Sequence, residues 1–271
     1  MKLAPGRFFG RTLLQRQSAG LTLNVSRYQP GREQPWHVHT HPTLFIPVLG
    51  NHRDQTRSSA RDQRELSLVF HPTCEPHAGI VGLDGLIGLN LEFEPGWLAQ
   101  HELEDSDLGG YRLVEPSVWV RLSVLRLVCL SFQSALDDWG ERNAQALELI
   151  EPLVNHEVPS GSPRWLRRAE DYLHEEFRSS ISLRDAAREA GVHPVYFARV
   201  FRRRHGCPVS AYLRALRLAE AGRLILRDGQ SLAQAAVIAG FADQSHLSRC
   251  FSRQFGFTPS AVRSAGDFLR A

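Results

Sequence analysis

The sequence predicts an α+β protein of two domains, with strands in the N-terminal half and helices in the C-terminal half. Between residues 21 and 93, apolar and polar residues alternate in short segments, which is the period of β-strands. From residue 164 onward, apolar residues recur every three or four positions, which is the period of α-helices. The chain has 271 residues, 42% hydrophobic and 23% charged, so each half is long enough to bury its own core.

The N-terminal domain, assigned to residues 1–115, contains four strand-like segments. Clusters of Pro, Gly, Asn and Asp separate them, and no helical stretch lies between them. Several short strands in this order predict an antiparallel barrel or jelly roll. The segments are LTLNVSRY at 21–28, TLFIPVL at 43–49, ELSLVF at 65–70 and LIGLNLEF at 86–93.

Helical periodicity returns at Pro116 and defines a helical segment over residues 116–157. A second helix is expected within it, from Asn143 to about Asn155. The first helix carries a mostly apolar stripe made up of Val120, Val124, Leu127, Val128 and Ser131.

A linker and an all-α domain complete the chain. Residues 158–163, VPSGSP, are rich in Pro, Gly and Ser, which exclude regular structure and allow the domains to reorient. The all-α domain is assigned to residues 164–271. It begins with an amphipathic helix at 164–177 and contains one uninterrupted helix at 209–226.

Residues 231–263 contain two helices joined by a tight turn. Apolar residues recur at helical spacing up to Ala239, and Gly240 then ends the pattern, as a left-handed residue does at a helix C-terminus. Asp243 is a good N-cap for the next helix. Its polar outer face, which includes Arg249, suits the major groove of DNA, but an ordinary solvated helix has the same pattern. The inner face is made up of Leu247, Cys250, Phe251 and Phe255.

Residues 182–206 repeat this pattern earlier in the chain. The matching positions are Leu183, Ala187 and Gly191 in the first copy and Leu232, Ala236 and Gly240 in the second. After a one-residue insertion, the matches continue as Arg199, Phe201 and Gly206 with Arg249, Phe251 and Gly256. The repeat therefore predicts two helix-turn-helix motifs, and in the first motif Phe197, Val200 and Phe201 are expected to face the core.

The two motifs resemble the double helix-turn-helix DNA-binding domain of the AraC/XylS family of transcriptional regulators. The second motif follows the family pattern A-x3-G-F-x-D-x-S-x-L/F-x-R-x-F-x3-F-G-x-x-P. Ala235 and Val262 in the second motif, and His193 in the first, depart from family usage. The matching residues are Ala236, Gly240, Phe241, Asp243, Ser245, Leu247, Arg249, Phe251, Phe255, Gly256 and Pro259.

Charge supports a nucleic-acid partner for this half of the chain. Residues 160–271 hold 18 Arg and no Lys against 10 acidic residues, a net charge of +8, whereas the whole chain carries only +3. We therefore expect the protein to bind double-stranded DNA. The expected DNA-binding residues are Val195, Ala198, Arg199, Arg202 and Arg203 in the first motif, and Gln244, Ser245, Ser248, Arg249 and Arg253 in the second.

Two alternatives stay open for these motifs. Arg199 and Arg249 could instead form ion pairs within the chain. The helix at 209–226 could present both motifs to one face of DNA about one turn apart, or the domain could bind through a single motif.

The N-terminal half also resembles a cupin, which is the typical sensor fold of this family. Gly31, His37, His39, Thr43 and Gly50 have the spacing of the first cupin motif, and Pro72 and His77 resemble the second. Thr43 stands where cupins have a glutamate ligand, so an organic effector is favoured over a metal in the pocket bounded by His37, His39 and His77. We expect no cofactor and no enzymatic activity.

The resemblance implies a transcriptional regulator controlled by a small-molecule effector. The helical segment is expected to form a homodimer interface, with packing inside one subunit as the alternative, and RNA polymerase is a further expected partner. The N-terminus lacks the apolar run of a signal peptide, and Arg121 and Arg126 interrupt the most apolar later stretch. We therefore expect a cytoplasmic protein without membrane association. The cysteines, expected to be reduced thiols, are Cys74, Cys129, Cys207 and Cys250.

Overall fold

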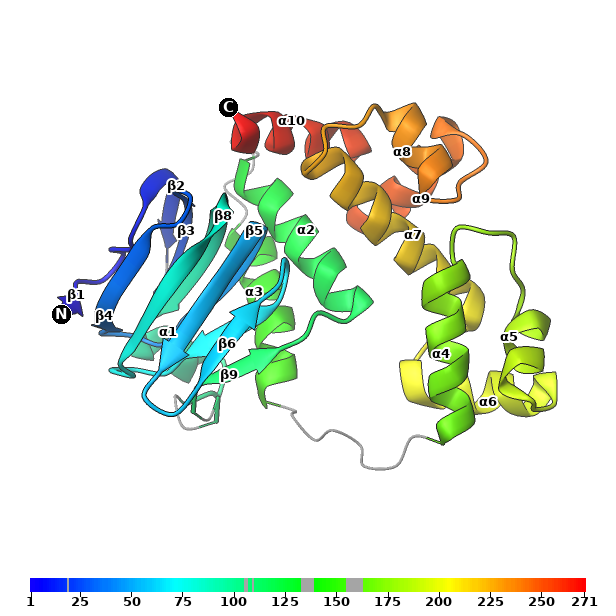
Figure 1. Cartoon of the computed structure of the whole chain (residues 1–271), viewed down its shortest axis with the longest axis horizontal. Helices are drawn as coiled ribbons and strands as arrows, with labels where there is room; N and C mark the ends of the chain where they lie inside the picture. Colours follow the sequence, from blue (N-terminus) through cyan, green and yellow to red (C-terminus); the bar gives the residue numbers. More distant parts are fainter. Residues whose placement is uncertain (19, 105–106, 109, 133–138, 155–162) are drawn as a thin grey trace. The chain divides into compact units, whose positions relative to one another are not determined.

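The computed structural model describes residues 1–18, 20–104, 107–108, 110–132, 139–154 and 163–271 (Figure 1). The chain divides into two compact units, Met1–His156 and Glu157–Ala271. The first unit is rich in β-sheet and the second is helical. The predicted strand-rich N-terminal region and helical C-terminal region are therefore both present. Most of the predicted linker, residues 158–162, lies outside the described residues.

The longest strand, β8, holds the sheet of the first unit together. β3 and β4 pair with different halves of β8, and β5 pairs with both halves. These pairings are antiparallel, whereas β1 pairs with β4 in parallel. The strands are β1 Lys2–Leu3, β2 Arg11–Ser18, β3 Leu21–Tyr28, β4 Glu33–His39, β5 Thr43–Thr56, β6 Ala60–Gln63, β7 Leu68–His71, β8 His77–Phe93 and β9 Arg112–Val114.

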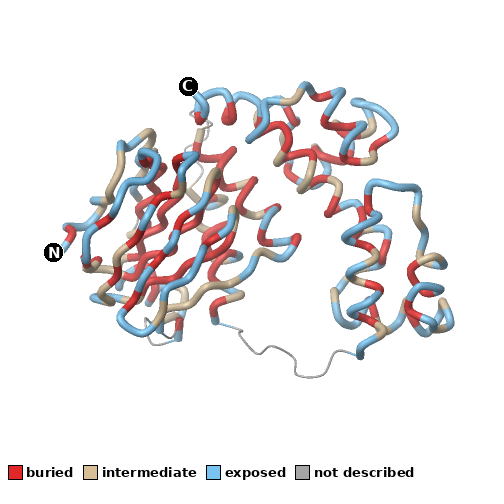
Figure 2. Tube along the Cα trace, in the orientation of Figure 1, coloured by how far each residue is buried: buried red, intermediate tan, exposed pale blue. Residues whose placement is uncertain are grey.

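The central strands are buried on both faces (Figure 2). Along β8, Leu89 and Leu91 alternate with Asn90 and Glu92, and all four side chains are buried. Because successive side chains of a strand point to opposite faces, Leu89 and Leu91 share one face of β8, and Asn90 and Glu92 share the other. Asn90 lines a cavity, so the face of β8 that carries Asn90 is turned toward it.

Three helices complete the described part of the first unit: α1 Pro95–Gln100, α2 Val118–Phe132 and α3 Trp139–Val154. α3 begins four residues before the predicted Asn143. α2 packs against α3, and Ser123 donates a hydrogen bond to Glu148 at 2.9 Å between them. The whole predicted stripe of α2 is buried. This burial favours packing of the stripe inside one subunit over a dimer contact.

The second unit consists of seven helices among its described residues. No helix in the described part of the chain is long and apolar enough to cross a membrane. The helices are α4 Arg164–Glu176, α5 Leu183–Ala190, α6 Pro194–His205, α7 Val209–Leu226, α8 Leu232–Ile238, α9 Gln244–Phe255 and α10 Pro259–Arg270.

Candidate functional site

The pairs α5–α6 and α8–α9 share the same turn geometry. In the first pair, the backbone N–H of Val192 donates to the carbonyl of Ala187 at 3.0 Å; in the second, Phe241 donates to Ala236 at 2.9 Å. Each bond spans five residues, as in a Schellman turn at a helix C-terminus. The predicted repeat is therefore present as two helix-turn-helix motifs.

Glycine is required in the second turn for two reasons. Gly240 has a φ of +84°, a left-handed conformation that side chains with a Cβ disfavour. A Cβ at Gly240 would also lie 2.5 Å from the backbone oxygen of Arg178, at the end of the α4 segment. The turn therefore packs directly on the backbone that leads into the first motif.

Both motifs bury aromatic residues on the inner face of their second helix. Phe197 and Phe201 of α6 and Phe251 of α9 are fully buried. The predicted inner face of α9 is buried throughout, whereas Val200, predicted as core in α6, is only half-buried. These contacts fix which face of each helix is turned outward.

The expected DNA-binding residues lie on those outward faces. Two of them, Ala198 and Ser248, are half-buried, and the others are exposed. The exposed residues are Val195, Arg199, Arg202, Arg203, Gln244, Ser245, Arg249 and Arg253.

The arginines of these faces differ from those that stabilise the fold. Arg223 contacts Glu220 at 3.0 Å, and Arg178 contacts the same carboxylate at 2.8 Å. Among the described residues, neither Arg199 nor Arg249 forms an ion pair, although the Arg199 guanidinium lies 5.6 Å from the ring centre of Tyr196. Both guanidinium groups are therefore available to an external anion or base edge.

The two outward helices begin with caps of different quality. Asp243 accepts a hydrogen bond from the backbone of His246 at 2.6 Å, which confirms it as the N-cap of α9. His193 occupies the same place in α6 and accepts from Val195 at 3.4 Å, a longer contact.

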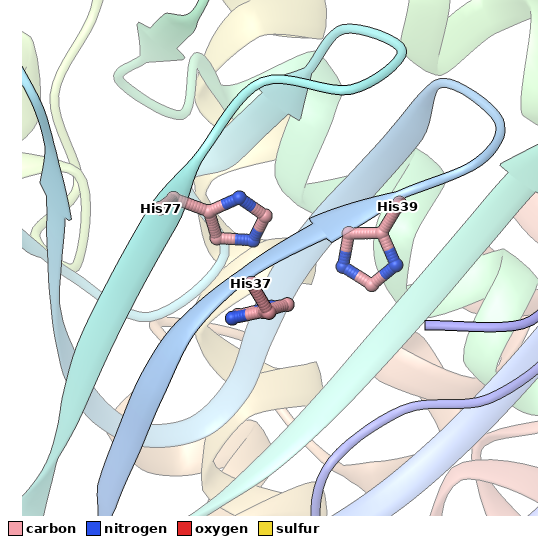
Figure 3. A group of neighbouring side chains, drawn as sticks. All are labelled: His37, His39 and His77. Carbon is pink, nitrogen blue, oxygen red and sulfur yellow. The ribbon is translucent and has the colours of Figure 1, made fainter. Parts of the chain in front are cut away.

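A second candidate site lies inside the N-terminal unit, where three histidine side chains meet. His37 and His39 come from β4, and His77 comes from the start of β8 (Figure 3). One ring nitrogen from each can be chosen so that all three lie within 4.8 Å of one another. All three side chains are buried.

Backbone carbonyls orient two of these rings. Nδ1 of His37 donates to the carbonyl of Pro35 at 2.8 Å, and Nδ1 of His77 donates to that of Glu75 at 3.0 Å. Each neutral ring then keeps its lone pair on Nε2, the arrangement found in metal-binding histidines. Nδ1 of His39 is buried without a hydrogen-bond partner among the described residues.

Burial also keeps these histidines uncharged. Desolvation lowers the pKa of His39 to about 3 and that of His77 to about 2. It also lowers the pKa of His37. Neutral imidazole is the form that coordinates a metal ion, so the three residues fit a divalent transition metal.

The cavity beside the three rings is small. About 30 Å³ is open to the centres of water molecules, where one water needs roughly 10–15 Å³. This volume fits an ion with one or two waters and is too small for a sugar or an aromatic acid. It therefore does not favour the organic effector expected from the sequence.

Among the other lining residues, His52 and Asp54 were not identified from the sequence. His52, Asp54 and Thr56 alternate along β5, and all three are buried. His52 and Asp54 line the cavity together with His71. The alternation of this segment could have placed His52 and Asp54 on one face, but nothing in it showed that this face meets the histidines of β4 and β8.

Three residues near the cupin-like motifs have other surroundings. His41 contacts the carboxylate of Glu92 at 3.1 Å, and Cys74 is exposed. Thr43 lines the cavity and donates a hydrogen bond to the carbonyl of His41 at 3.2 Å.

Comparisons with known proteins identify the helical unit. A family model described as "Helix-turn-helix domain" matches residues 186–265. The HTH-type transcriptional regulator ExsA of Pseudomonas aeruginosa is 29% identical over 120 residues, which cover 44% of this chain and 43% of ExsA. The HTH-type transcriptional activator RhaS of Escherichia fergusonii is 25% identical over 179 residues, 62% of this chain and 63% of RhaS. The chain thus spans less than two thirds of either relative.

A solved structure shows a similar match. It is a transcriptional regulator, described as an AraC-type DNA-binding domain-containing protein, from Chromobacterium violaceum. It is 26% identical, covers 38% of this chain and 91% of its own, and has a TM-score of 0.36. On the motif residues and these sequence matches, residues 186–265 are similar to the helix-turn-helix domain of AraC-type transcriptional regulators.

Proposed function

We propose that the protein is a transcriptional regulator that binds specific sequences of double-stranded DNA through residues 164–271. The observation that carries this proposal is the pair of outward arginines, Arg199 and Arg249. They occupy matching places in the two motifs, and neither has an ion-pair partner among the described residues.

The residues of the two outward faces have different proposed roles. Arg249 and Gln244 read base edges, because Arg pairs with guanine and Gln with adenine in the major groove. Val195 and Ala198 contact thymine methyl groups, and Arg199 reads guanine. Arg202, Arg203 and Arg253 lie near the ends of their helices and contact phosphates, and Ser245 and Ser248 complete the second surface.

The N-terminal unit is proposed to be a cupin-like sensor over residues 1–115, followed by a helical segment at 116–157. The effector is a small ligand that binds in the histidine cavity. The N-terminal unit senses this ligand and does not catalyse a reaction. We propose that the regulator acts as a homodimer and contacts RNA polymerase. Because the α2 stripe is buried, the dimer contact would use exposed residues of the helical segment such as Trp119, which is 37% exposed.

The experiment is a selection with the full chain from a pool of random DNA duplexes. We expect enrichment of one sequence motif and an affinity that falls steeply with salt, because several arginines displace counterions from phosphates. Recovery of unselected sequences, with salt-dependent binding retained, would show that the protein binds DNA without sequence specificity. Salt-independent binding would remove DNA as the partner.

A further inference from the structure

Asp54 is a buried carboxylate whose charge has no counterpart nearby. Its side chain is 1% exposed, and neither carboxylate oxygen has a hydrogen-bond partner among the described residues. Leaving such a group buried without donors is costly unless it is protonated or faces a cation. Burial of Asp54 therefore favours either its protonated form or a bound cation beside it.

His71 contacts both the carboxylate of Asp54 and the ring of His77, and so connects Asp54 to the three histidines. Its Oδ2 lies 3.7 Å from Nε2 of His71. The ring of His71 stacks on that of His77 with 3.7 Å between their centres and an angle of 19°. His71 is neutral, since burial holds its pKa well below the usual value, so it does not balance the charge of Asp54.

All of these groups favour the same kind of ligand. The neutral rings of His37 and His77 keep their Nε2 lone pairs free, and the carboxylate of Asp54 also only accepts. Aromatic and amide side chains also line the small cavity, but the imidazole lone pairs and the carboxylate charge favour a cation. An organic cation would exceed the cavity of about 30 Å³.

We propose that His37, His39 and His77 bind a divalent transition-metal ion, and that Asp54 stabilises this ion from the outer sphere. Asp54 thus supplies the negative charge that Thr43 does not. Imidazole ligands suit zinc, nickel, copper and iron, whereas magnesium, calcium and manganese prefer oxygen ligands. The effector of the N-terminal unit is then a metal ion. This inference goes beyond DNA binding, which uses residues of the other unit.

The first experiment measures metal binding by the full chain without a histidine tag. After treatment with a chelator, the protein is titrated with Zn²⁺ in competition with a chromophoric chelator, and with Co²⁺ by visible absorption. We expect about one ion per chain for the wild type and for His101→Ala, a control histidine whose ring contacts Trp97 and does not line the cavity. The double variant His37→Ala, His39→Ala should bind none.

Folding of the variants is checked separately. Circular dichroism should match the wild type, and Zn²⁺ should raise the melting temperature of the wild type but not of the double variant. If the double variant fails to fold, His77→Gln replaces it, because Gln keeps a polar side chain of similar length. Absence of Zn²⁺ binding by the wild type, or equal binding by a folded triad variant, would overturn the site.

The role of Asp54 is tested with Asp54→Asn, which keeps the shape of the side chain and removes its charge. We expect Zn²⁺ affinity about 10- to 100-fold below that of the wild type, with the stoichiometry unchanged. At pH 7.5, above the raised pKa of Asp54, the metal-free variant should melt at a higher temperature than the metal-free wild type, because an unpaired charge has been removed. Equal Zn²⁺ affinity in the two proteins would overturn the assignment of Asp54. A loss of affinity without a gain in metal-free stability would mean that Asp54 is a structural residue.

Discussion

The carboxylate of Asp243 accepts a hydrogen bond from the backbone N–H of His246 at 2.6 Å and so closes the first turn of α9. This bond satisfies one of the backbone donors that every helix N-terminus leaves free. It also sets the start of the helix that carries Gln244 and Arg249. The orientation of the proposed second reading surface therefore depends on Asp243.

We expect Asp243→Ala to destabilise the helical unit by about 1 kcal/mol, the usual cost of losing an N-cap. The matched control is His193→Ala in α6, where the cap contact is 3.4 Å long and the loss should be smaller. His193→Ser should stabilise the unit. Denaturation of the full chain followed by circular dichroism measures these changes. Equal losses from the two alanine variants would show that cap geometry does not limit stability here.

Arg249→Ala should weaken binding to the selected DNA by about 1–3 kcal/mol and relax the preference at one base pair. The control, Arg203→Ala, should weaken binding to all sequences alike and lower the salt slope by about 1, because it loses one phosphate contact. Binding-site selection with both variants checks this. If Arg249→Ala selects the wild-type motif with wild-type affinity, its role as a base reader is wrong.

The two motifs should read DNA segments about one helical turn apart, roughly 34 Å on one face. α7 is continuous from Val209 to Leu226 and so separates them by a fixed helix. We expect Arg199→Ala and Gln244→Ala to change base preferences at two separate positions of the selected site. Footprinting measures the spacing of the two protected DNA segments, and binding-site selection measures the base preferences of each variant. A change from Gln244→Ala alone would mean that only the second motif reads bases.

Stability of the metal-free chain should depend on pH through Asp54. Burial raises the pKa of Asp54 from 3.8 to about 7, so the folded state holds a proton that the unfolded state releases. The stability that this proton provides is present below about pH 4 and is lost as the pH rises toward 7. The advantage in unfolding free energy of Asp54→Asn over the wild type should therefore grow across this range.

Urea unfolding of both proteins with a chelator, at several pH values between 4.5 and 7.5, tests this dependence. Comparison with the variant isolates Asp54, because the titrating histidines are common to the two proteins. A difference that stays constant with pH would show that the pKa of Asp54 is not raised in the folded chain.

The helix-turn-helix unit could be predicted from the sequence because its determinants are local. Ser182 and Ser231 cap helices, Gly191 and Gly240 end them, and each acts on residues a few positions away. The strand at residues 21–28 was predicted for the same reason, since alternation is a property of neighbouring residues. The extent of α3 and the half-buried position of Val200 depend on packing and were missed.

The sequence by itself determined that His37 and His39 share one face of a strand, because side chains alternate along β4. Only the tertiary structure decided that His77 meets them and that Asp54 and His71 line the same cavity. These residues come from four strands, and their proximity follows from the pairing of β4 and β5 with β8 and of β7 with β5. Strand pairing between distant segments leaves no local pattern, whereas helix caps and turns do.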